Sequence, residues 1–200
     1  IRDELIHFFL AGQETTAVAL AWIVHHLTIE PEWADRVAAE ADQVLRGRFP
    51  TISDLSRLAI THRVINEALR LTPPAYGIGR RLLRDQVLGN WRIPAESVVI
   101  VSPYVMHRHP DYWDTPTRFD PDRFSPGRRL PPRPRYTYFP FGGGPRRCLG
   151  RHLAMMEMLA ITAQLARRYR FHGVPGSRVV PRSGMTLRPH PGVLVHLSSR

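Results

Sequence analysis

The sequence predicts a mainly α-helical protein that also contains small β-sheets. Two observations lead to the helical part: apolar residues recur with helical spacing through most of the first 71 residues, and again from about residue 149. A third observation leads to the sheets, because short apolar segments bounded by glycine, asparagine and proline follow the first helical stretches. The 200 residues contain no internal repeat and no sign of a second domain.

The first part of the chain is expected to form four helices. Pro31 suits the first position of a helix, where its missing N–H would have no partner in any case. Ser53 is the expected cap of a short helix, and Pro73 and Pro74 end the helix before them. The expected bounds are 1–27, 31 to about 46, a short helix after Ser53, and about 60–71.

The second part is expected to contain short strands, one long connection and one more helix. Strand-like segments cover Val87–Leu88 and Val98–Val101, with a turn at Gly89 and Asn90 between them. Residues 103–140 are dense in proline, so little regular structure is expected there. A helix covers about 149–170, and a small hairpin sheet is expected from the tail segments 179–180, 185–187 and 193–197.

Composition and charge exclude several classes of protein. The hydrophobic fraction of 43% is ordinary for a soluble globular protein, and no apolar run is long enough to cross a membrane. The net charge is +11 and all 28 basic residues are arginine, but they are scattered, so we expect no nucleic-acid partner. The chain starts at Ile1 inside an apolar helical pattern, so we expect its true N-terminus to be missing. We expect a cytoplasmic location and leave a membrane anchor open.

The single cysteine, Cys148, lies in the most informative segment of the chain, residues 141–150, FGGGPRRCLG. Three glycines permit a tight turn, and the two preceding arginines favour a thiolate over a thiol. The helix that is expected to follow also favours an anion at its start. One thiolate in such a loop suits an axial haem ligand. The alternative for a lone cysteine is a buried structural residue.

A second segment, AGQETT at residues 11–16, lies inside the long first helix. Ala11 and Gly12 remove side-chain bulk, so a flat or small molecule can approach the helix. The hydroxyl of Thr15 can bond to the carbonyl one turn earlier, and with Glu14 it can form a proton relay. The alternative is a helix kink with a solvated glutamate.

Two further groups of residues combine charge with apolar neighbours. Glu67 and Arg70 share one helix face and can pair, and Arg123 is a candidate third member that would attach the proline-rich segment to the helix. The alternative is an ordinary surface pair. Arg80, after the proline break, can bind a carboxylate bidentately or be a solvated loop residue. No Walker loop, nucleophile elbow or His-Glu-x-x-His motif occurs.

Taken together and in this order, the motifs resemble the cytochrome P450 family of haem-thiolate monooxygenases. The last motif is highly specific. The resemblance implies the C-terminal half of that fold, from the long distal helix through the proximal cysteine loop to the following helix, with residues 1–200 as a partial domain. The four matching motifs are Ala11-Gly-x-Glu14-Thr15, Glu67-x-x-Arg70, Pro121-Asp-Arg123-Phe124 and Phe141-x-x-Gly144-x-Arg146-x-Cys148-x-Gly150.

The resemblance also implies roles for these residues around haem b. Cys148 would be the proximal iron ligand, and Phe141 would pack near its sulfur. Backbone N–H groups of the glycine loop, which includes Gly144 and Gly150, would tune the thiolate. Arg146 and Arg80 would bind the haem propionates. Ala11 and Gly12 would leave a groove for dioxygen, and Glu14 and Thr15 would deliver protons. Ala75, Tyr76 and Met185 would line part of the substrate pocket. Glu67, Arg70 and Arg123 would be structural.

The resemblance implies that the full-length parent inserts one oxygen atom into a small apolar organic substrate. Electrons would come from a ferredoxin or a flavoprotein reductase that docks near Arg146, Arg147 and Arg151. The alternatives are a peroxide-dependent haem-thiolate enzyme and a truncated, non-catalytic remnant. One departure from the family pattern is Asp122 in place of glutamate, a change that we expect to be tolerated.

Overall fold

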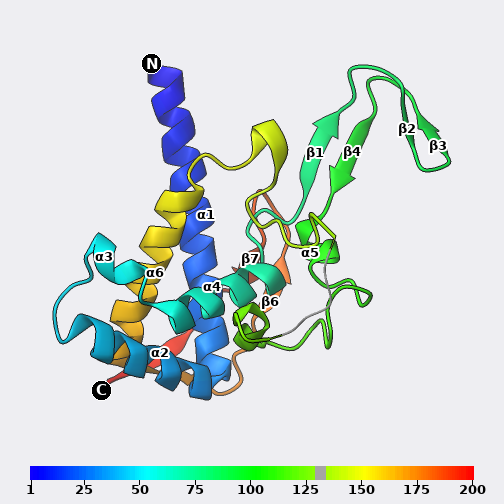
Figure 1. The fold of residues 1–200 in the computed structure, drawn as a ribbon. Coiled ribbons are helices and arrows are strands. Elements are labelled where there is room, and N and C mark those ends of the chain that lie inside the picture. The colour runs from blue at the N-terminus through cyan, green and yellow to red at the C-terminus, as the bar shows by residue number, and fades with distance from the viewer. Residues whose placement is uncertain (129–133) are drawn as a thin grey trace.

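A computed structural model describes residues 1–128 and 134–200. It confirms the predicted fold class, because long helices form the body and the strands form small antiparallel pairs (Figure 1). The long helices are α1 (Arg2–Ile29), α2 (Pro31–Leu45), α4 (Ala59–Leu71) and α6 (Arg151–Arg168). The shorter ones are α3 (Ile52–Leu55), α5 (Pro103–Met106) and the 3-10 helices η1 (Pro121–Phe124) and η2 (Gly144–Arg146).

The four long helices share one hydrophobic core. Ile23 of α1, Val37 of α2, Ile65 of α4 and Ala163 of α6 are all fully buried in it. The carboxylate of Glu40 on α2 accepts hydrogen bonds from the backbone N–H groups at the start of α4, which have no partner within that helix. Apolar packing and this cap together place α4 against α2.

Only the second half of α1 belongs to this core. The first half projects from the body (Figure 1), and its apolar side chains, including Leu5, Phe8 and Phe9, are exposed. Large exposed apolar surface of this kind is unusual on a monomeric soluble protein and marks a contact surface. In the part of the chain that the structure describes, no helix has the length and apolarity needed to cross a membrane.

The predicted cap of the short third helix is wrong by two residues. Thr51, and not Ser53, is the N-cap of α3. Asp54 completes a capping box, because its carboxylate accepts from the backbone N–H of Thr51 at 2.8 Å. Arg48 binds the same carboxylate, which holds the pKa of Asp54 well below its usual range. Both Thr51 and Ser53 suit a cap, and the carboxylate three residues after Thr51 is the signal that separates them.

The middle of the chain forms two antiparallel strand pairs that project from the body as one long hairpin (Figure 1). Strand β1 (Ile78–Arg81) pairs with β4 (Val98–Val101), and β2 (Gln86–Leu88) pairs with β3 (Trp91–Ile93). The predicted strands correspond to β2 and β4. Their partners β1 and β3 were missed because each contains arginine and lacks a run of apolar residues.

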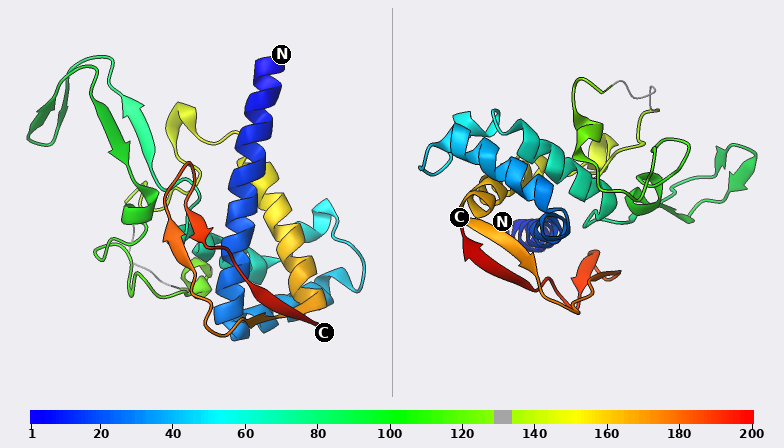
Figure 2. Two further views of the ribbon diagram at one scale, coloured as in Figure 1. Left: turned by 180° about the vertical axis from the view of Figure 1, so that it is seen from behind. Right: turned by 90° about the horizontal axis from the view of Figure 1, so that it is seen from below.

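The tail is organised differently from the prediction of one hairpin sheet. Strand β6 (Val180–Arg182) pairs with β7 (Arg188–His190), while β8 (Val195–Ser199) pairs with β5 (Tyr169–Gly173), which follows α6 directly. The predicted strand at residues 185–187 is wrong, because these residues form the bend between β6 and β7. Figure 2 shows the β6–β7 hairpin beside α1.

A histidine of α1 is buried without charge at the edge of the core. The ring of His26 stacks on Phe119 at 4.7 Å between centroids, and its Nε2 lies 3.3 Å from the Thr72 hydroxyl. Burial lowers the pKa of His26 to about 3, with a smaller contribution from nearby positive charge. The folded protein therefore holds this ring neutral at pH values where an unfolded chain would protonate it.

This burial predicts a pH dependence of stability. The pKa of His26 is lower in the folded protein than in the unfolded chain. Its contribution to the unfolding free energy is therefore fully present above pH 6.5 and is lost as the pH drops from 6.5 towards 3. In this pH range the unfolding free energy of the full-length protein should fall less steeply in His26→Gln than in the wild type. We expect the two slopes to differ by about 1.4 kcal/mol per pH unit, measured by urea unfolding at several pH values. His196→Gln, at an exposed position, is the control; equal slopes in the two variants would contradict the prediction.

Candidate functional site

The cysteine loop leads from an irregular segment, residues 134–140, to α6. Its two ends are joined by a hydrogen bond of 2.9 Å from the backbone N–H of Cys148 to the carbonyl of Phe141. The loop passes through the single turn of η2, and α6 begins three residues after the cysteine (Figure 1). The Cys148 side chain is exposed and has no disulfide partner, since it is the only cysteine. The sulfur is therefore not buried by the residues of this chain.

Three glycines of the loop, at residues 142–144, are each required for a specific reason. Gly142 and Gly144 have φ values of +69° and +70°, in the left-handed region that other residues rarely adopt. At Gly143, a Cβ atom would lie 2.3 Å from the ring of Tyr136, so any side chain would collide with it. The predicted tight turn is present, and it depends on the close approach of an aromatic ring as well as on backbone conformation.

A pocket of about 410 Å³ lies between the β1–β4 pair and the cysteine loop. Its lining includes Arg80 from β1 and Gly144 from the loop, which are two of the predicted cofactor-binding residues. The remaining lining is largely apolar and aromatic, with Ile78 and Phe139 among its members. Arg80 and Arg146 are both exposed. The structure therefore brings one predicted arginine and one loop glycine to a common pocket.

The polar segment of α1 has an open helix surface. A Cβ atom on Gly12 would meet no other atom within 4 Å, so the helix surface is unobstructed at this residue. One turn later, the Thr15 hydroxyl donates to the carbonyl of Ala11 at 2.7 Å, as the sequence suggested. Thr28, further along the same helix, bonds in the same way to Val24.

The carboxylate of Glu14 binds residues of the tail. Its Oε1 accepts from the Thr186 hydroxyl at 2.6 Å and from Nη2 of Arg188 at 2.8 Å. The hydrogen bonds from Thr186 and then from Arg188 are the main reasons that the pKa of Glu14 lies below its usual value. Sequence reasoning missed these two partners because they lie more than 170 positions away, and no local pattern connects them.

The tail bend approaches the connection between α4 and β1. The Tyr76 hydroxyl donates to the carbonyl of Gly184 at 2.9 Å, and the backbone N–H of Leu187 donates to the carbonyl of Pro74 at 3.0 Å. Ala75 and Met185 are both exposed beside these contacts. The two segments predicted to line a substrate pocket are thus adjacent to each other.

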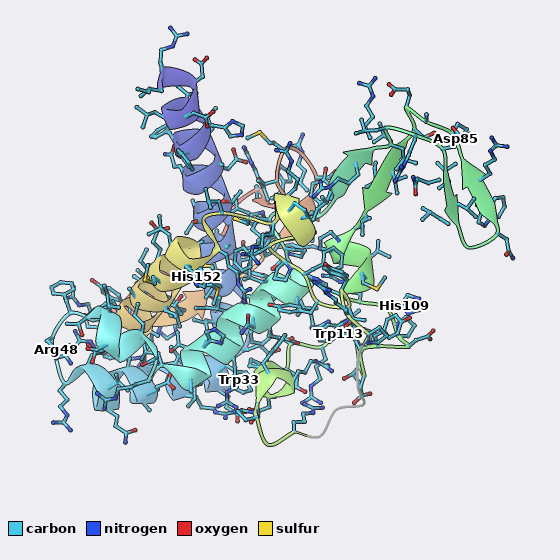
Figure 3. All side chains as sticks on the ribbon, turned by 45° about the horizontal axis from the view of Figure 1, so that its top comes forward. Trp33, Arg48, Asp85, His109, Trp113 and His152 are labelled. Carbon is cyan, nitrogen blue, oxygen red and sulfur yellow. The ribbon has the colours of Figure 1, made fainter. Side chains whose placement is uncertain are left out.

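The charged residues of α4 form a buried network. The Glu67 carboxylate and the guanidinium groups of Arg70 and Arg123 are all fully buried. Arg70 binds both carboxylate oxygens at 2.7 Å, while Nε of Arg123 lies 3.3 Å from Oε1. The arginine of η1 is therefore attached to α4. In Figure 3 the labelled Trp113 lies beside α4, and its ring is 5.0 Å from the Arg70 guanidinium carbon.

Asp122, where the family pattern has glutamate, has partners on two helices. Its carboxylate pairs with Arg63 of α4, at 2.5 Å, and with Arg36 of α2, at 3.5 Å. The shorter side chain therefore still connects η1 to the helical body. Within residues 1–128 and 134–200, no group of three or more histidine, cysteine or acidic side chains is arranged to hold a metal ion.

Comparison with known proteins identifies the family. The sequence matches the cytochrome P450 family over residues 1–196. A Streptomyces melanosporofaciens protein named cyclooctatin synthase is 43% identical over 191 residues, which cover 96% of this chain and 41% of that protein. A second protein of the same organism, named cyclooctat-9-en-7-ol 5-monooxygenase, is 40% identical, with 88% of this chain and 38% of that protein covered. Protein LUTEIN DEFICIENT 5, chloroplastic, from Arabidopsis thaliana is 36% identical over this whole chain and 34% of its own length.

The chain belongs to the cytochrome P450 family. It spans less than half the length of these curated relatives. Membership implies haem iron as the cofactor. The residues present fit that group in two respects: an exposed cysteine thiol stands on a loop held by its own backbone, and Gly12 leaves a helix surface free of side chain.

The buried network yields a prediction of stability. Glu67→Gln removes the negative charge and leaves two buried guanidinium groups without a counter-charge. We expect a loss of about 3–5 kcal/mol in the unfolding free energy of the full-length protein, measured with urea. Glu32→Gln, on the exposed face of α2, is the matched control and should change stability by less than about 0.5 kcal/mol. Similar losses in the two variants would contradict the prediction.

Proposed function

We propose that the full-length protein containing this chain is a haem-thiolate monooxygenase that inserts one atom of dioxygen into a small apolar organic substrate. The observation that carries the proposal is the exposed Cys148 on a glycine-constrained loop at the start of α6, in a chain of the cytochrome P450 family. Haem, proposed to be haem b, would supply the activation of dioxygen.

On the proximal side, Cys148 is the proposed iron ligand. Thiolate ligation through sulfur favours cleavage of the O–O bond. The hydrogen bond from the backbone N–H of Cys148 to the carbonyl of Phe141 closes the loop. Backbone N–H groups of this loop, which contains Gly144 and Gly150, are proposed to tune electron donation by the thiolate. Arg146 and Arg80 are the proposed partners of the haem propionates, and the position of Arg80 in the pocket beside Gly144 supports this assignment.

On the distal side, α1 provides the dioxygen groove and the proton relay. Ala11 and Gly12 give the groove, since neither places a large side chain on the helix surface. Thr15 donates its hydroxyl proton to the Ala11 carbonyl, which leaves the lone pairs of its oxygen free to accept. To pass its own proton on, the hydroxyl would turn away from that carbonyl. Glu14, at the adjacent position, is the proposed carboxylate that takes up protons from solvent.

The substrate is proposed to be a small apolar molecule. Tyr76 and Gly184 join two segments by a hydrogen bond, and Ala75 and Met185 stand exposed beside it, available to contact a substrate. The names cyclooctatin synthase and cyclooctat-9-en-7-ol 5-monooxygenase, carried by two relatives, are consistent with an apolar substrate class. The remainder of the pocket would come from parts of the protein outside this chain.

The electron donor is proposed to be a ferredoxin or a flavoprotein reductase. The three exposed arginines around the cysteine loop, Arg146, Arg147 and Arg151, give this face a positive charge. An acidic donor would be attracted to such a surface and orientated by it. The donor is therefore proposed to dock on the side of Cys148, with Glu14 and Thr15 as the proposed distal residues.

The first test concerns the iron ligand. In the full-length protein we expect the reduced carbon monoxide complex to show the red-shifted Soret band of a thiolate-ligated haem. Cys148→Ala removes the sulfur and should abolish this band and lower haem loading, measured by absorbance. Ser53→Ala, at an exposed position of α3, is the control and should keep the wild-type spectrum. Normal haem loading with an unchanged spectrum in Cys148→Ala would overturn the proposal.

The second test separates dioxygen activation from a peroxide-dependent enzyme. Thr15→Ala removes the relay hydroxyl, and we expect turnover with NADPH and redox partners to fall by about 100-fold. Hydrogen peroxide should restore turnover, because it brings its own protons. Thr28→Ala removes a hydroxyl with the same bonding on the same helix and should leave the rate unchanged. Unchanged dioxygen turnover in Thr15→Ala would show that Thr15 is not part of the relay. Wild-type turnover with hydrogen peroxide and none with NADPH and redox partners would favour the peroxide-dependent alternative.

A further inference from the structure

The Glu14 carboxylate is bound asymmetrically. All three of its hydrogen bonds reach Oε1: one from the Thr186 hydroxyl at 2.6 Å and two from Arg188, at 2.8 Å from Nη2 and 3.2 Å from Nε. Nε of Arg188 also lies 3.4 Å from the Thr186 hydroxyl. In the described ranges, 1–128 and 134–200, Oε2 has no hydrogen-bond partner. One oxygen is thus fixed and the other remains available.

The two partners of Glu14 are themselves held in place by the residue between them. The backbone N–H of Leu187 donates to the carbonyl of Pro74, and the buried indole N–H of Trp22 donates to the carbonyl of Leu187 at 2.7 Å. Trp22 lies two turns after Glu14 on α1. The helix therefore binds the tail at two separate positions, through Glu14 and through Trp22. Thr186 is almost completely buried, which limits its freedom further.

The positive charge next to the Glu14 carboxylate comes from the tail hairpin. Arg188 is the charged group that faces Glu14 from the tail hairpin, and its effect on the Glu14 pKa acts in the same direction as its hydrogen bonds. The opposite residue on β6, Arg182, is also an exposed arginine, paired with Arg188 in the strand register. Arg188 therefore binds Glu14, and the neighbouring Arg182 is a matched control for substitutions of Arg188.

We propose that Arg188, with Thr186, is a positioning residue for proton delivery: it holds Oε1 of Glu14 so that Oε2 stays free to carry the proton. This role rests on the proposed function of Glu14. Oε2 accepts a proton from solvent and releases it towards the Thr15 hydroxyl, and Glu14 returns to the carboxylate form that Arg188 stabilises. Arg188 touches neither substrate nor haem in this role, and acts through Glu14.

The kinetic test uses the full-length holoenzyme with its redox partners. Arg188→Gln frees the carboxylate to rotate, and we expect dioxygen-supported kcat to fall by about five- to tenfold. The peroxide-supported rate and the substrate dissociation constant should stay within about twofold, because neither requires proton delivery. Arg188→Lys keeps the charge and should recover part of the rate. Arg182→Gln should behave as wild type.

Two outcomes would overturn the role of Arg188. The first is an Arg188→Gln variant that is indistinguishable from Arg182→Gln. The second is a double variant, Glu14→Gln with Arg188→Gln, whose dioxygen-supported rate is lower than that of Glu14→Gln alone. A residue that acts through Glu14 has no further effect once the Glu14 carboxylate is removed. An unchanged dioxygen rate in Glu14→Gln alone would instead show that the proposed function of Glu14 is wrong.

A measurement without turnover tests the pair itself. In urea unfolding of the full-length protein, Glu14→Gln and Arg188→Gln should each lower the midpoint, and the double variant should fall by less than the sum of the two. Additive changes would show that the two side chains do not interact in solution, and would overturn the positioning role even if Glu14 delivers protons.

Discussion

The interaction on which the rest of the structure depends is the buried pair of Glu67 and Arg70. Arg70 uses all five of its N–H donors: two bind the Glu67 carboxylate, and three bind the backbone carbonyls of residues 107, 116 and 118. A lysine has three donors and could not make this set of bonds. Because a buried charge is costly unless it is paired and fully hydrogen-bonded, residues 107–118 are held in a course that satisfies Arg70. One ion pair thus determines the path of a segment with little regular structure.

The tail depends on α1 in a similar way, through single long-range hydrogen bonds. The β6–β7 pair is a two-stranded hairpin, which is marginally stable by itself. Trp22 and Glu14 of α1 bind the bend and the first residue of β7, and thereby fix the hairpin beside the helix (Figure 2). The same bonds bring a basic residue to the carboxylate of the proposed relay. The contacts that hold the tail beside α1 therefore include the hydrogen bonds to the Glu14 carboxylate.

The sequence predicts what is local and misses what is distant. Helical periodicity predicts α1, α2, α4 and α6 within a few residues, because apolar residues recur at helical spacing in each of them. The glycines before Cys148 predict a tight turn, which φ values at Gly142 and Gly144 confirm. Strands β1 and β5, and the pairing of β5 with β8, were not predicted, since strand pairing depends on a partner elsewhere in the chain. The contacts of Glu14 were missed for the same reason.

The buried pair also reaches the cysteine loop through a short chain of bonds. Arg70 binds the carbonyl of His107, and Nε2 of the His107 ring accepts the backbone N–H of Phe139 at 2.9 Å. Burial lowers the pKa of His107 to about 3, so the ring stays neutral and Nε2 remains an acceptor. Phe139 lies two residues before Phe141, whose carbonyl accepts from Cys148. Hydrogen bonds and two short stretches of backbone therefore connect Glu67 and Arg70 to the cysteine loop, without any direct contact between the two sites.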